Sequence, residues 1–168
     1  MAALTGDGGM TYLFVKWLHL LGASVLFGTG IGIAFFAWFG YRRAMRVDDI
    51  GLLRGVLALT VTADTVFTAT AAVVQPITGA ALWFMAGGSW HSAWLAAVLL
   101  LYVFVGACWL PVVALQIRLR DRAMEAVQVR DLGDEFHARF RKWFVLGWPA
   151  FAGVLALFAL MIFRGAFE

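Results

Sequence analysis

The sequence predicts an all-α fold, a four-helix transmembrane bundle with both termini outside the cell (N-out/C-out) and a basic, helical cytoplasmic loop between the third and fourth helices. Three observations lead to this prediction. Of the 168 residues, 63% are hydrophobic and the mean hydropathy is +0.87, far above that of ordinary soluble domains. Four apolar stretches each reach the length of about 20 residues that a helix needs to cross a bilayer. Finally, eleven of the 13 Lys and Arg residues fall in two stretches between these apolar runs.

The two basic stretches set the expected topology. Basic loops beside transmembrane ends are retained in the cytoplasm, which favours an even number of crossings with both termini outside. Between the two stretches, from Val56 to Ile117, the chain has no Lys or Arg. The first stretch holds Arg42, Arg43, Arg46 and Arg54, and the second holds Arg118, Arg120, Arg122, Arg130, Arg139, Arg141 and Lys142.

The four helices are expected at about residues 12–41, 55–85, 92–117 and 143–163, so that residues 1–168 form a single integral membrane domain. The first apolar run is too long for a signal peptide, so this helix is retained and crosses with some tilt. Trp83, Trp90 and Trp94 flank the outer turn between the second and third helices, as is typical of the headgroup level. The loop at 118–142 is expected to be helical on either side of a break at Gly133. The fourth helix completes the bundle.

Composition and charge exclude several classes of function. The net charge of +3 does not indicate nucleic-acid binding, because the basic residues lie beside the membrane, where they orient the chain and meet anionic lipid. Cys108 is the single cysteine, which excludes an intramolecular disulfide and a thiolate metal cluster. The chain has no HExxH motif and no serine-protease triad, so hydrolytic chemistry has no support. His91 and His137 fall in the expected loops, where both are interpreted as solvated.

Prolines and small residues are expected to shape the bundle. Each of the last three helices contains one proline, which frees a carbonyl about one turn earlier that must be met by a neighbouring helix, a hydroxyl group or water. The prolines are Pro76, Pro111 and Pro149, and the freed carbonyls are those of Ala72, Ala107 and Val145. The resulting kinks either shape the bundle or open a cavity for a cofactor or substrate. Gly28 and Gly32 form a small-xxx-small pair that favours close helix packing.

His19 is the first polar residue that could carry chemistry. It lies about 10 Å inside the first helix at a rise of 1.5 Å per residue. A neutral imidazole at that depth can hydrogen-bond a neighbouring helix, ligate haem iron, or bind copper or zinc. Periodicity leaves both the structural and the ligand interpretation open. Gln75 of the second helix lies at a comparable depth, so Gln75 and His19 are expected to share one pocket near the outer leaflet.

A polar stripe along the second helix contains Thr60, Thr62, Asp64, Thr65, Thr68, Thr70, Gln75 and Thr78. Thr65, Thr68 and Gln75 fall close to one helical face with Asp64 or its neighbours, so the stripe is expected to face the interior of the bundle. An intramembrane carboxylate must be neutral, hydrated or paired, and Arg54 could reach Asp64 only near the interface. The stripe is either a structural polar seam or the surface of a proton path or polar substrate site.

Two motifs carry a resemblance to known proteins. The KWLHLLG run at residues 16–22 and the RKWF entry to the fourth helix at residues 141–144 resemble the HemJ/CopD-like group of bacterial four-helix membrane proteins. The whole chain is still more similar to an uncharacterised "predicted integral membrane protein" family with a domain of unknown function. In the wider group, HemJ proteins are haem-b-binding protoporphyrinogen oxidases and CopD-type proteins are linked to copper transport. The resemblance implies haem b at His19, with copper as the alternative. The resemblance does not extend to the oxidase reaction, because Ala96 follows Trp94-Leu95 where HemJ proteins carry a lysine.

The leading hypothesis is a small polytopic protein of the bacterial cytoplasmic (inner) membrane that binds haem b through His19 and has a redox or porphyrin-related role. Gln75 and Thr68 would line the cofactor pocket, and His19 would be the metal ligand.

Two alternatives come from other classes of function. A non-catalytic membrane subunit or assembly factor would pack through the Gly28/Gly32 face into a homo-oligomer or a larger membrane complex. A small transporter would use Asp64, with Thr65 beside it, to carry a proton or another substrate. The lipid bilayer is the expected partner in every case.

Overall fold

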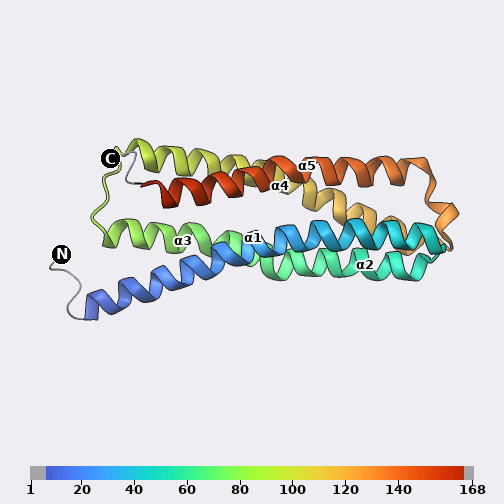
Figure 1. The fold of residues 1–168 in the computed structure, drawn as a ribbon, viewed down its shortest axis with the longest axis horizontal. Helices are drawn as coiled ribbons and strands as arrows, with labels where there is room; N and C mark the ends of the chain where they lie inside the picture. Colours follow the sequence, from blue (N-terminus) through green and yellow to red (C-terminus); the bar gives the residue numbers. More distant parts are fainter. Residues whose placement is uncertain (1–6, 165–168) are drawn as a thin grey trace.

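The computed structural model describes residues 7–164, and within that range the chain is all-helical. Four helices are long and apolar enough to cross a membrane, and they run along one common axis (Figure 1). The elements in chain order are α1 (Asp7–Val47), α2 (Ile50–Ala63), the π-helix η1 (Asp64–Ala69), α3 (Thr70–Met85), α4 (Ala93–Glu125), the 3-10 helix η2 (Val129–Leu132) and α5 (Gly133–Ile162). The predicted four-helix transmembrane fold is confirmed. The predicted outside location of the chain ends falls on residues 1–6 and 165–168, which lie outside the described range.

The helices extend further than hydropathy predicts. α1 continues past residue 41 to Val47, α4 continues past residue 117 to Glu125, and α5 begins at Gly133 instead of residue 143. Arg, Lys, Glu and Gln are good helix formers, so a helix need not stop where its hydrophobic stretch stops. The expected break at Gly133, with a φ of 71°, is observed. The first basic loop is reduced to Asp48, with a φ of 51°, and Asp49, whose carboxylate caps the N-terminus of α2.

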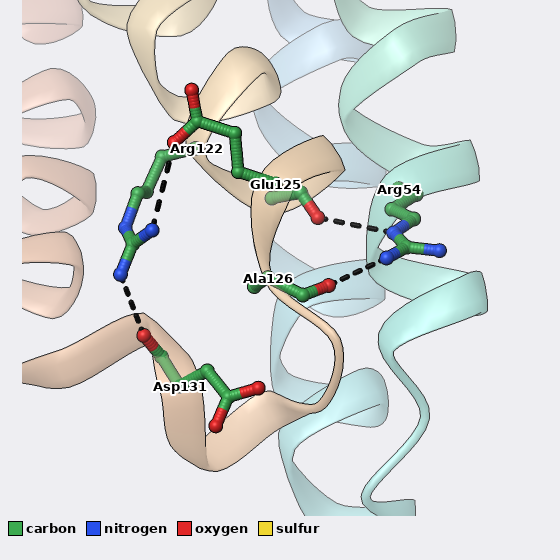
Figure 2. Close-up of polar contacts among 6 residues, drawn as sticks. Arg54, Arg122, Glu125, Ala126 and Asp131 are labelled. Atoms are coloured by element: carbon green, nitrogen blue, oxygen red, sulfur yellow. Dashed lines mark hydrogen bonds and ion pairs between the residues drawn. The ribbon is translucent and has the colours of Figure 1, made fainter.

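Arginine side chains close the basic end of the bundle, which we define as the end holding the Asp48–Asp49 turn and η2. Figure 2 shows Arg54 of α2 reaching the last turn of α4. Its Nε donates to the Ala123 carbonyl at 3.1 Å, and its Nη2 donates to the Ala126 carbonyl at 2.5 Å. Arg122 Nη2 donates to the Asp131 carbonyl at 2.7 Å. The last carbonyls of a helix lack intrahelical partners and favour cationic donors, so these bonds fix α2 and η2 to the end of α4.

The hydrophobic core is concentrated in the basic half of the bundle. The Phe140 ring is fully buried and stacks on Tyr41 with ring centroids 4.0 Å apart. The side chains of Leu53, Leu57 and Leu119 pack in the same cluster. This core joins α1, α2, α4 and α5, so the four membrane-crossing helices are fastened to one another mainly at the basic end.

Polar and aromatic contacts join the helices at the opposite end. The indoles of Trp83 and Trp94 stack with ring centroids 5.6 Å apart, and Trp94 Nε1 donates to the Leu160 carbonyl at 2.8 Å. The Tyr102 hydroxyl donates to the Ala72 carbonyl, which Pro76 would otherwise leave without its helical partner. The expected need for a hydroxyl partner at Ala72 is therefore met by α4. Trp83, Trp94 and Tyr102 thus hold α3 to the α4–α5 pair.

The expected close packing at Gly28 and Gly32 is wrong for the described chain. A Cβ added at either position would meet no atom within 4 Å among residues 7–164, so this face of α1 points outward. The close helix approach occurs instead at Gly40, where an added Cβ would lie 2.6 Å from a methyl group of Val56. The spacing of small residues predicts which faces of a helix allow another helix to approach closely. Which of these faces makes the contact depends on where the neighbouring helix lies.

The basic end is predicted to lie in the cytoplasm, and cysteine labelling can test this. In a Cys108→Ala background, Ser89→Cys in the turn between α3 and α4 is expected to react with a membrane-impermeant maleimide in intact cells. Val127→Cys, exposed at the basic end, is expected to react only after the membrane is permeabilised. Labelling of Val127→Cys but not Ser89→Cys in intact cells would reverse the orientation.

Candidate functional site

Polar side chains gather in two places between the membrane-crossing helices. The histidine cluster consists of His19, Gln75 and Thr78 and joins α1 to α3. The carboxyl cluster consists of Asp64, Trp109, Gln116 and Trp143 and joins the second membrane-spanning helix to α4 and α5.

The histidine cluster is held by two hydrogen bonds between α1 and α3. His19 Nδ1 lies 2.8 Å from Thr78 Oγ1, and Gln75 Nε2 donates to the His19 carbonyl at 2.8 Å. Gln75 and Thr78 are buried, and His19 is half-buried. The structure therefore places Gln75 and His19, which the sequence analysis assigns to one depth, in direct contact.

The surroundings of the Thr78 hydroxyl favour a proton on Nδ1 of His19. The hydroxyl lies 2.9 Å from the Val74 carbonyl and 3.2 Å from the Gln75 carbonyl, both in its own helix, and donation of its single hydrogen to either leaves it to accept from Nδ1–H of His19. A neutral imidazole protonated at Nδ1 has a free lone pair at Nε2. An Nδ1–H bond of this kind is also the contact that orients metal-ligating histidines in proteins.

Glycines make room for the histidine cluster on both helices. A Cβ at Gly22 of α1 would lie 2.5 Å from Gln75 Nε2, and one at Gly79 of α3 would lie 3.3 Å from His19 Cε1. Any larger residue at position 22 would displace the Gln75 amide, since real Cβ atoms do not approach so closely. The two glycines allow the helix backbones to come close enough for these bonds.

The carboxyl cluster surrounds one buried acid. Asp64 is 6% exposed; its Oδ1 accepts from Trp109 Nε1 at 3.2 Å and its Oδ2 accepts from Gln116 Nε2 at 2.8 Å. Trp143 Nε1 in turn donates to Gln116 Oε1 at 3.2 Å. Because an indole N–H can only donate, Trp143 fixes the Gln116 amide with its NH2 group toward Asp64. Arg54, considered as a partner of Asp64, is directed to the end of α4 instead.

The threonines of the predicted stripe do not all face the interior. Thr60 and Thr68 are buried, and neither hydroxyl has a hydrogen-bond partner within residues 7–164. The Thr68 hydroxyl faces the Asp64 carboxyl without reaching hydrogen-bond geometry, so Thr68 belongs beside Asp64. Thr65 is exposed on the outside of the bundle, and its hydroxyl donates to the Val61 carbonyl at 2.8 Å. The prediction of an interior position is wrong for Thr65, because residues adjacent in a helix point about 100° apart.

Sequence reasoning missed three members of the carboxyl cluster. Gln116 is an amide within the otherwise apolar third span, a signal equal to the one that singled out Gln75. Trp109 and Trp143 carry no such signal, since an indole is equally suited to a core or a headgroup position.

His137, which the sequence predicts to be solvated, is half-buried, and its Nδ1 lies 2.7 Å from the Tyr41 hydroxyl oxygen.

Within residues 7–164, four helices are long and apolar enough to cross a bilayer, so the chain is an integral, multi-pass membrane protein with four candidate spans. The chain belongs to the family described as "Predicted integral membrane protein (DUF2269)", which matches residues 13–165 and whose function is unknown. No curated protein and no solved structure matches the chain. The comparisons do not show the resemblance to the HemJ/CopD-like group.

Proposed function

We propose that this protein is a small polytopic protein of the bacterial cytoplasmic membrane that binds haem b through His19 and has a redox or porphyrin-related role. The observation that carries the proposal is the 2.8 Å contact between His19 Nδ1 and Thr78 Oγ1, which favours the tautomer whose Nε2 lone pair is available to an iron ion. When bound, haem supplies one-electron chemistry or porphyrin recognition.

The donor set of the chain favours haem over a bare metal ion. No three His, Cys, Asp or Glu side chains gather into a metal-binding group within residues 7–164. A porphyrin brings four nitrogen ligands of its own, so one imidazole from the protein can anchor it. Gln75 and Thr78 act as positioning residues, because they fix the backbone and the ring of His19. Thr68, which the sequence predicts to line the cofactor pocket, lies beside Asp64 instead.

The absorbance spectrum of protein purified after haem-replete expression tests the proposal. We expect a Soret band in the wild type and in the matched control His91→Ala, which changes an exposed histidine in the α3–α4 turn. We expect His19→Ala to lose the band and Thr78→Val to weaken it, because valine cannot accept the Nδ1–H bond. A wild-type protein without a Soret band would refute haem binding. If copper copurifies with the wild type but not with His19→Ala, and no Soret band is present, His19 binds copper instead of haem.

The outward-facing Gly28/Gly32 surface favours a second candidate, a non-catalytic membrane subunit or assembly factor. An added Cβ at Gly28, Gly30 or Gly32 would meet nothing within 4 Å in the described chain, so another helix could approach closely there. This candidate predicts copurification with a membrane partner, loss of the partner in Gly28→Leu, and no effect of His19→Ala. Partner binding that survives Gly28→Leu would remove the basis for it.

A further inference from the structure

Asp64 is a buried acid that no basic side chain neutralises. It begins the π-helix η1, near the centre of the second membrane-spanning helix. The ion pairs within residues 7–164 are Arg120–Asp121, Arg122–Glu125 and Arg139–Glu135, all at the basic end. Arg54 lies about 15 Å away along the helix, at 1.5 Å per residue, and is bonded to α4. The charge of an Asp64 carboxylate would therefore have no countercharge.

The hydrogen bonds at Asp64 orient its carboxyl group without cancelling a charge. From α4 it meets Trp109 and Gln116, and from α5 it meets Trp143 through Gln116. All of these donors are neutral N–H groups, and no charged or titratable side chain of residues 7–164 is paired with the carboxyl group. An unpaired carboxylate in a low-dielectric interior is strongly disfavoured, and such a group binds a positive charge in preference to remaining ionised.

Two unused hydroxyl groups flank Asp64 on its own helix. Thr60 is 2% exposed and Thr68 is 7% exposed; neither hydroxyl has a partner in the described chain. They precede and follow Asp64 by about one helical turn, and Thr68 faces the carboxyl group. A buried polar group normally has a hydrogen-bond partner, so these two hydroxyl groups are available to a further hydrogen-bonding group that enters the site.

We propose that Asp64 is an intramembrane proton-binding site in which Trp109 and Gln116 orient the carboxyl group, with the hydroxyls of Thr60 and Thr68 about one helical turn to either side of it. The π-helix fits this assignment, because π-helical turns are rare and occur frequently at functional sites. The site joins η1 to α4 and α5, so gain or loss of the proton changes a contact between three membrane-spanning helices. The inference does not depend on haem binding at His19.

Labelling with dicyclohexylcarbodiimide tests the proposal on the purified full-length protein in detergent. The O–H of a protonated carboxyl group adds across one C=N bond of this apolar reagent, and the product rearranges to a stable N-acylurea without losing an atom. We expect peptide mass spectrometry to find the adduct on Asp64 and not on the exposed acids Asp134 and Glu135, with a yield that falls as the pH rises. Asp64→Asn is expected to lose the adduct.

Trp109→Phe, which keeps an aromatic ring but removes the indole N–H, is expected to raise the pH at which labelling is half-maximal. The reason is that the ionised carboxylate loses a hydrogen-bond donor while Gln116 still orients the carboxyl group. No adduct on Asp64 in the wild type at any pH would overturn the proposal. Protection by sodium but not by potassium at fixed pH would also overturn it, and would assign the site to a metal cation instead of a proton.

Discussion

Replacing Phe140 with alanine is expected to lower the free energy of unfolding by about 3–5 kcal/mol. The Phe140 ring is fully buried, stacks on Tyr41 and also packs against Trp38 and Trp143. Rings from α1 and α5 close this part of the core, so neighbouring side chains cannot easily fill the cavity that alanine would leave. Unfolding by a denaturing detergent, followed by tryptophan fluorescence, measures the loss.

Phe35→Ala provides the matched control for Phe140→Ala. Phe35 is 64% exposed on the outside of α1 and pairs with Phe39, so its truncation is expected to change the free energy of unfolding by about 1 kcal/mol. Equal losses in the two variants would mean that the aromatic core at the basic end does not hold the bundle together.

Gln116→Ala is expected to lower the free energy of unfolding by about 2–6 kcal/mol. Gln116 is 2% exposed and bonds both Asp64 and Trp143, so its removal leaves two polar atoms, Asp64 Oδ2 and Trp143 Nε1, without these bonds, each costing about 1–3 kcal/mol. The same detergent titration measures this loss. A loss below about 1 kcal/mol would show that water or another side chain takes over both bonds.

A pair of substitutions tests which partner donates in the hydrogen bonds that Gln116 makes with Asp64 and Trp143. Asp64→Asn alone turns an amide NH2 group toward a donor, whether toward Gln116 or toward Trp109, so it is expected to be destabilising. Adding Gln116→Glu restores an acceptor for both Asn at position 64 and Trp143, so the double variant is expected to recover most of the loss. If the losses in stability of Asp64→Asn and Gln116→Glu, each measured alone, simply add up in the double variant, the proposed donor directions are wrong.

The fold could be predicted from the sequence because the number of spans follows from one quantity, the length of the apolar stretches. The helix ends could not, since hydropathy marks the edge of the bilayer and not the end of the hydrogen-bonded helix. Glu125 and Val47 end helices that continue well past their apolar stretches. At the basic end, Asp49 and Gly133 end or begin helices through local backbone chemistry, and of these only Gly133 was recognised.

The candidate site could be predicted only in part. His19, Asp64 and Gln75 stand out because a polar side chain in an apolar run is costly and must have a partner. Their partners depend on which helix lies opposite, and the sequence does not contain that information directly. Thr65 and Thr68 differ by three positions in sequence, yet Thr65 is exposed on the outside of the bundle and Thr68 is buried beside Asp64.

The six residues of η1 set the rotational phase between the two halves of the second membrane-spanning helix. A π-helical turn holds one residue more than an α-helical turn, so deleting one residue there would rotate α3 by about 100° about its axis relative to α2. Asp64 would keep its place beside α4, while Gln75 and Thr78 would swing away from α1. The extra residue in the π-helical turn thus allows the second membrane-spanning helix to contact His19 of α1 and Gln116 of α4 at the same time.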